Sequence, residues 1–78
     1  MQKIIITTEN LHLEASNYVI TESEIVLVGT INDDTPLSYW LKISIVYKYS
    51  IEVTTKDTIN MWIPQSDITT IQYQNDTN

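Results

Sequence analysis

The sequence contains no cysteine, and this absence excludes several kinds of chemistry. Without thiols the chain has no disulfide, no thiol nucleophile and no thiolate ligand for a metal. The start of the chain, MQKIIITTEN, has only three consecutive apolar residues, which is too few for the core of a signal peptide, and no stretch is long and apolar enough for a membrane span. We therefore expect a cytoplasmic protein with no cofactor and no association with membranes.

Arginine is also absent, and the charge balance is strongly acidic. Ten Asp and Glu residues face four lysines, so the formal net charge is −6 at pH 7. Arginine is the preferred residue for bidentate contacts with phosphate and guanine, and a negative chain is repelled by nucleic acids and by anionic lipids. The composition therefore argues against direct binding of nucleic acid.

What the chain does contain is typical of β-structure. Thirteen isoleucines, five valines and eleven threonines are joined by seven aromatic residues, and this mixture suits pleated, half-buried surfaces. No long stretch of Ala, Leu and Glu repeats with a period of 3.6, so we predict no long helix. At 78 residues the chain is short enough for one domain. We expect a single all-β domain over residues 1–74 and a frayed tail over residues 75–78.

The apolar patterning predicts five to seven short strands. Six of them are expected at Lys3–Thr7, Leu11–Ala15, Tyr18–Thr21, Glu24–Ile31, Ile59–Pro64 and Ile68–Tyr73. The segment Asn32–Pro36 is predicted to be a loop. The only glycine, Gly29, lies inside a predicted strand, where an isolated glycine usually marks a bulge or a close backbone approach.

The segment Leu37–Thr55, LSYWLKISIVYKYSIEVTT, alternates with a period of two, which predicts a strand. A straight strand of this length would span roughly 60 Å at about 3.3 Å per residue, whereas a compact chain of this size has a radius of gyration near 11 or 12 Å. We therefore predict that the segment bends near Tyr47–Ser50 and is shared between two nearly orthogonal sheets. The expected fold is a small SH3-like barrel, with a strongly bent antiparallel sheet as the alternative.

Parity also predicts the hairpin that follows. A three-residue loop, Lys56–Thr58, places apolar side chains opposite one another on one face, whereas a two-residue loop would pair outward with inward positions. The predicted cross-strand pairs are Thr55 with Ile59, Val53 with Met61, and Ile51 with Ile63.

The segment Ile51–Tyr73, IEVTTKDTINMWIPQSDITTIQY, resembles the second half of an SH3-like or Sm-like small barrel, including the bacterial Hfq type. The resemblance implies a strand, a short turn, a second strand, a one-turn helical kink and a final strand. Where Hfq-like proteins carry a lysine-histidine pair before the last strand, this chain has Gln65, Ser66 and Asp67. The resemblance therefore implies a barrel but no RNA-binding site. We expect the Asp67 side chain to cap the kink.

Catalytic and metal sites find little support in the remaining polar residues. Asn32, Asp33 and Asp34 offer fewer oxygens than a calcium loop needs, and they lack its glycine, so a solvated turn is favoured. Glu22 and Glu24 would share one strand face without a cleft, which indicates ordinary surface charge. His12, the only histidine, lies beside Glu14 with no serine or cysteine partner fixed by a motif. We expect no catalytic residue, no metal site and no enzymatic activity.

Two tryptophans break the alternation of the long segment and of the hairpin. Trp40 and Trp62 occupy even positions, off the apolar odd face, together with Val46, and Lys42 and Lys48 share that side. The tryptophans are either covered by the amino-terminal strands or exposed for a protein partner, since Trp is enriched at binding hot spots. A base-stacking strip with two cations is a third interpretation.

Two functions remain open. The first is a small adaptor or regulatory module that docks on a larger protein through Trp40, Trp62, Val46, Lys42 and Lys48. It could also form a homo-oligomer, because the strand edge predicted between Ile43 and Tyr47 carries few charges. The second is an acidic inhibitor that places carboxylates in the basic groove of a nucleic-acid enzyme. Its candidate residues are Glu9, Glu14, Glu22, Glu24, Asp33 and Asp34. Six net charges are few for such a mimic, so the adaptor is favoured.

Overall fold

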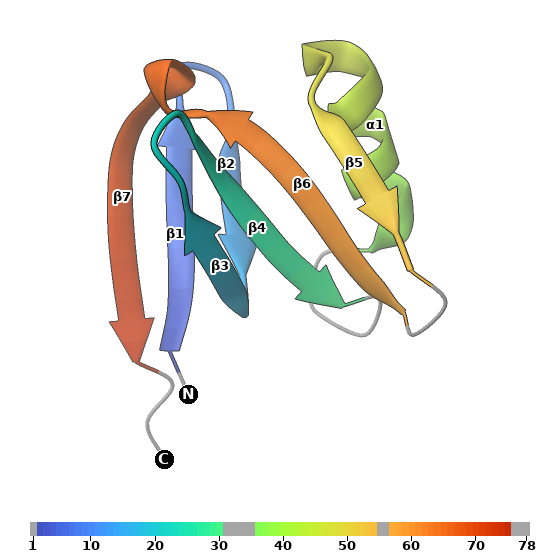
Figure 1. Ribbon diagram of the computed structural model, residues 1–78, viewed down its shortest axis with the longest axis horizontal. Helices are drawn as coiled ribbons and strands as arrows, with labels where there is room; N and C mark the ends of the chain where they lie inside the picture. Colours follow the sequence, from blue (N-terminus) through green and yellow to red (C-terminus); the bar gives the residue numbers. More distant parts are fainter. Residues whose placement is uncertain (1, 31–35, 55–56, 76–78) are drawn as a thin grey trace.

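The computed structural model describes residues 2–30, 36–54 and 57–75, and within them the chain forms two antiparallel sheets (Figure 1). One sheet has three strands in the order β2-β1-β7 and the other has four in the order β3-β4-β6-β5. The strands are β1 (Gln2–Thr8), β2 (His12–Ala15), β3 (Asn17–Ile20), β4 (Glu24–Thr30), β5 (Ser50–Val53), β6 (Thr58–Pro64) and β7 (Ile68–Asn75). The helical parts are α1 (Leu37–Tyr47) and the 3-10 turn η1 (Gln65–Asp67). The prediction of an all-β fold with no long helix is confirmed.

All six strands predicted outside the long segment are present, and in β2 and β6 the apolar alternation matches the burial of one face. β6 is the clearest case: Ile59, Met61 and Ile63 are fully buried, and the residues between them are half-buried. The end of the fourth predicted strand, Ile31, and the loop residues 32–35 lie outside the described residues.

The chain passes between the two sheets at two short connections. β2 leads into β3 through Ser16 alone, and β6 leads into β7 through η1. The helical kink expected at Gln65–Asp67 is therefore confirmed. The expected capping role of Asp67 is wrong, because η1 has no side-chain cap and Asp67 is its last residue. The Asp67 carboxylate instead accepts a hydrogen bond from the Tyr49 hydroxyl at 3.1 Å.

The prediction of a strand over the first part of the long segment is wrong, because Leu37–Tyr47 is a helix. The same residues also carry a helical pattern, since Trp40, Ile43 and Tyr47 recur at spacings of three and four and turn toward the core. Tertiary packing of this face overrides the β-propensity of the isoleucines and valine. The helix begins after the extended Pro36 and ends where Lys48 adopts a left-handed conformation with φ 61°. The predicted bent strand shared between two sheets is therefore wrong: the chain changes direction at Tyr47–Ser50 because the helix ends there, and only β5 enters a sheet. The strand edge expected between Ile43 and Tyr47 is likewise absent, because these residues are helical.

The hairpin that follows keeps the predicted parity but shifts the register by two residues. Val53 pairs with Ile59 and Ile51 with Met61, so odd positions still face odd positions. The Thr54 N–H donates to the Thr58 carbonyl at 2.8 Å. The hairpin therefore closes at Thr54 and Thr58, one residue earlier on each strand than the predicted pair of Thr55 and Ile59. Thr55, which was predicted to pair with Ile59, and Lys56 of the predicted loop lie outside the described residues.

The core lies between the inner faces of the two sheets and extends under α1. Trp40 is completely buried there, and its ring lies against Gly29 of β4. A Cβ atom on Gly29 would lie 2.8 Å from Cζ2 of Trp40, closer than real Cβ contacts come. Gly29 pairs in regular register with Ile59, so it marks a close approach and not a bulge. The Trp40 Nε1 donor is buried without a hydrogen-bond partner in the part of the chain that is described.

We predict that Gly29→Ala destabilises the fold by about 1–3 kcal/mol, because the added methyl group overpacks against a rigid, buried indole ring. Urea unfolding of the two proteins measures this cost. Adding Trp40→Phe should recover part of it in the double variant, since the smaller ring leaves room for the methyl group. Strictly additive effects of the two changes would show that the Trp40–Gly29 contact does not limit packing.

Candidate interaction surfaces

The solvent side of α1 is apolar. Tyr39, Leu41, Ile45 and Val46 are all exposed, and Ile45 reaches 76%. The opposite side of the same helix carries Trp40, which belongs to the core. Exposed apolar groups that lie together on a surface mark sites of interaction. We call Tyr39, Leu41, Lys42, Ile45 and Val46 the α1 surface.

The charge of this region is opposite in sign to that of the whole chain. The helix Leu37–Tyr47 contains Lys42 and no acidic residue, and Lys48 follows at its carboxyl end. Both lysines are exposed. Two of the four lysines of a chain with a net charge of −6 therefore lie on α1 or directly after it. An acidic or carboxylate-flanked partner would meet a locally positive surface here.

A shallow hollow separates the α1 surface from the turn between β1 and β2. Its volume is about 190 Å³, and it is lined by Asn10 and Leu11 of the turn and by Tyr39, Lys42 and Val46 of the helix, among others. Sites for small molecules usually measure about 300–1,000 Å³. The hollow is therefore better suited to a side chain of a partner protein than to a ligand of its own.

The structure divides the patch that the sequence suggested. Val46 and Lys42 lie together on the α1 surface, and Lys48 is exposed at its end. The prediction that Trp40 is an exposed binding residue is wrong, because the helix turns it to the same side as Ile43 and buries it. The first interpretation of the tryptophans was that the amino-terminal strands cover them. Trp40 is indeed covered, but because its own helix packs it on the core.

Trp62 lies on the other face of the four-stranded sheet. Its neighbours in β6, Met61 and Ile63, point into the core, so the half-buried Trp62 points outward. It pairs with Val26 of β4, which in turn pairs with Val19 of β3. Val26 is only 9% exposed on this outer face, and Val19 is 54% exposed. Trp62 therefore belongs to a cross-strand apolar row that is separate from the α1 surface.

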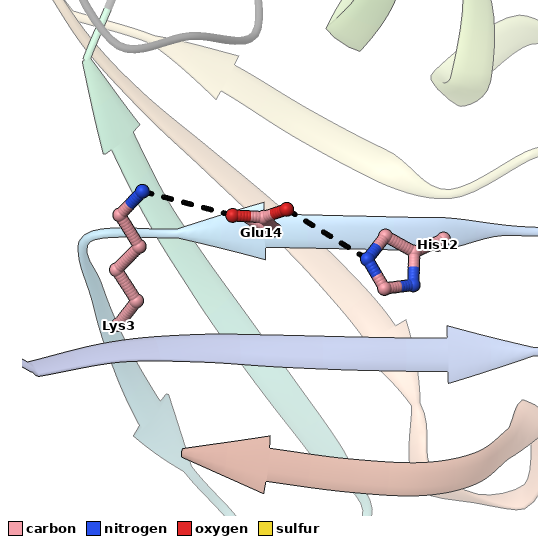
Figure 2. A network of polar contacts seen from close by, with 3 residues as sticks. All are labelled: Lys3, His12 and Glu14. Carbon is pink, nitrogen blue, oxygen red and sulfur yellow. Dashed lines mark ion pairs between the residues drawn. The ribbon is translucent and has the colours of Figure 1, made fainter. Parts of the chain in front are cut away.

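Glu14 is engaged in two long ion pairs on the outer face of the three-stranded sheet (Figure 2). One oxygen lies 3.7 Å from Nζ of Lys3 and the other lies 3.7 Å from Nε2 of His12. All three side chains are substantially exposed, so each pair contributes at most about 1 kcal/mol. The described residues contain no group of three or more His, Asp or Glu side chains that could hold a metal ion.

The other candidate acidic residues gather at one end of the sheets. Glu9 lies in the turn between β1 and β2, and Glu22 lies in the turn between β3 and β4, with Glu24 just after it. η1 joins the second of these turns, because the Gln65 N–H donates to the Ser23 carbonyl at 2.9 Å. Both turns and η1 appear at the top of Figure 1. Asn32, Asp33 and Asp34 lie outside the described residues.

A buried tyrosine links the end of α1 to η1, and no sequence motif predicted it. Tyr49 is only 9% exposed, stacks on Tyr47 with ring centroids 5.8 Å apart, and donates its hydroxyl hydrogen to Asp67. Burial, reinforced by the hydrogen bond to Asp67 and its negative charge, raises the pKa of Tyr49 to about 12. The contact joins residues 18 positions apart and therefore leaves no local signal.

We predict that Tyr49 makes the stability fall at high pH. An unfolded tyrosine loses its proton near pH 10, whereas folded Tyr49 holds it up to about 12, so the stabilisation is complete below about pH 10 and is lost as the pH rises toward 12. Urea unfolding from about pH 9 to 12 should show a shallower decline for Tyr49→Phe than for the wild type. Equal declines in the two proteins would contradict this assignment.

Comparisons with known proteins give no relative: no protein-family model, curated protein or solved structure matches this chain. The order of elements implied by the Sm-like resemblance is present over Ile51–Tyr73, but the resemblance itself stays a prediction. Within the described residues, no helix has the length and apolar character needed to cross a membrane. The surfaces described above are therefore the basis for inferring function.

Proposed function

We propose that the protein is a non-enzymatic binding module that docks on a larger protein through the α1 surface. The observation that carries this proposal is the exposure of Leu41, Ile45 and Val46 on a helix whose opposite side is already used by the core. Full burial of one such side chain contributes about 1.5–3 kcal/mol. A partner that covers this surface gains that energy without any rearrangement of the domain, which we place in the cytoplasm.

The partner that fits best offers an apolar groove flanked by carboxylates. Leu41 and Ile45 are four residues apart and so lie on one stripe of the helix, as in helices that bind in grooves. The hollow beside Val46 can receive one side chain of the partner. Lys42 and Lys48 favour acidic groups at the rim, which contribute more to orientation and association rate than to affinity.

The proposal is tested by photo-crosslinking in the native host, followed by measurement of affinity. A photo-reactive amino acid at Ile45 captures the partner, and the same group at Val19 on the outer sheet face serves as the control. We predict that Ile45→Asp weakens binding of the purified partner by about tenfold or more, because it places a charge at a desolvated contact. Val19→Asp, a change of similar exposure elsewhere, should change the affinity less than about twofold.

Both variants should remain folded, because both positions are more than half exposed, and circular dichroism checks this. If Ile45→Asp and Leu41→Asp bind the captured protein as tightly as the wild type, the α1 surface is not the docking site and the proposal is wrong.

The acidic inhibitor is the second candidate, favoured by the carboxylates at one end of the sheets. Glu9 and Glu22 lie on two turns at that end, and Glu24 follows the second turn. We predict that salt separates the two functions: a nucleic-acid mimic should lose most of its affinity between about 50 and 200 mM salt, whereas apolar contacts of α1 should barely respond. The double variant Glu9→Gln and Glu22→Gln should release the partner only if the mimic is correct.

A further inference from the structure

β7 is an edge strand with an unguarded free side. It pairs with β1 on one side, and no described strand pairs with its other side. Its eight residues, ITTIQYQN, include no charge and no proline, and every residue of 69–74 is exposed. A bulge disturbs the pairing only near Thr69, so the stretch Thr70–Asn75 pairs regularly with β1. Such an edge is a template for another strand.

The strands at the other three edges have features that normally protect a sheet edge, and β7 lacks these features. β2, β3 and β5 have four residues each. β2 carries His12 and Glu14, and β5 carries Glu52. Short length and charge both discourage pairing with another chain. β7 has neither protection over its regular stretch, which indicates that this edge is covered in the working protein.

Side chains at this edge are only partly covered. Ile71 pairs with Ile6 and Tyr73 pairs with Ile4, so both belong to the inner face of the sheet, yet they are 39% and 48% exposed. Tyr73 packs on Tyr18 of β3 with ring centroids 5.6 Å apart, but this contact leaves about half of its surface open. A hollow of about 230 Å³ lies beside Ile68–Ile71 and reaches Ile25. One additional strand along β7 would cover these groups.

We propose that this strand is β7 of a second copy of the chain, paired antiparallel about a two-fold axis at Gln72. This register keeps the contact within the regular stretch and sets inner side chains beside inner side chains. Ile71 of each copy then faces Tyr73 of the other, which forms two aromatic–β-branched pairs, and Thr70 faces Gln74. A register centred on Ile71 would instead bring the bulge at Thr69 opposite Tyr73.

Local charge does not oppose a second copy at this position. Two molecules that each carry a net charge of −6 repel one another, but a strand without charged residues places no like charges opposite each other. The resulting sheet has three strands from each copy, and its outer edges are the short, charged β2 strands. The assembly therefore closes as a dimer and does not grow into a fibre.

The dimer is independent of the proposed function, because β7 and α1 lie on opposite sides of the molecule (Figure 1). Pairing through β7 leaves both α1 surfaces of the dimer free. A partner can therefore bind each copy whether or not the chain dimerises.

Sedimentation of the full chain from micromolar to near-millimolar concentration tests the proposal. Gln72→Lys and Gln72→Glu should each raise the dimer dissociation constant about fivefold or more, because like charges then meet at the axis. An equimolar mixture of the two variants should restore the dimer through opposite charges. Ser66→Lys and Ser66→Glu, which make the same charge changes on exposed η1, should leave dimerisation unchanged.

Disulfide trapping tests the register separately, since the natural chain has no cysteine. Side chains directly opposite on paired strands have Cβ atoms about 4.5–5.5 Å apart, close to disulfide distance. Oxidised Gln72→Cys should therefore form a covalent dimer, whereas Gln74→Cys and Ser66→Cys should form little. The proposal is overturned if the chain is a monomer at every concentration or if the charge at position 72 does not affect dimerisation. It is also overturned if cysteines at all three positions are trapped equally. If the charged variants fail to fold, wild-type sedimentation and Gln72→Cys trapping decide.

Discussion

The contact between Trp40 and Gly29 is the constraint on which the rest of the arrangement depends. The indole ring lies where a side chain on β4 would otherwise be, and only glycine leaves that space. This contact sets the rotation of α1 about its axis, and the Tyr49–Asp67 hydrogen bond holds the chain just beyond its end. Because the rotation is set, Ile43 turns inward and Ile45 turns outward. The Trp40 Nε1 donor, buried with no partner among the described residues, is a polar cost that the tight packing of the ring must offset.

The candidate surfaces follow from how little core a chain of this size can build. The three-stranded sheet covers only part of the inner face of the four-stranded sheet, and α1 covers another part. Such a short chain buries only about 60% of the surface that its unfolded form exposes. Apolar side chains are consequently left exposed on the outer side of α1, at the free edge of β7 and on the outer face of the four-stranded sheet at Val19. The two proposals concern partners that would cover the first two of these places.

The segment Leu37–Tyr47 shows where prediction from the sequence reached its limit. Its apolar residues satisfy a period of two at the odd positions, and they also satisfy helical spacing at Trp40, Ile43 and Tyr47. Trp40 and Val46 at even positions are the signal that the alternation is incomplete, and the sequence left open whether they are covered or form an exposed patch. Of the five residues of the suggested patch, Val46 and Lys42 do lie together on the surface. Trp40 does not, because the helix carries it into the core.

The sequence by itself determined the strands whose alternation matches a single buried face, the parity of the β5–β6 hairpin, the turn at Gln65–Asp67 and the special position of Gly29. These features depend on neighbouring residues and on which face each side chain takes, so local pattern specifies them. Only the tertiary structure decided that Leu37–Tyr47 is helical, which register the hairpin adopts, that Tyr49 meets Asp67, and which strand edge stays open. The physical reason is that each of these outcomes is a competition between packings of residues far apart in the chain, and alternation is compatible with more than one of them.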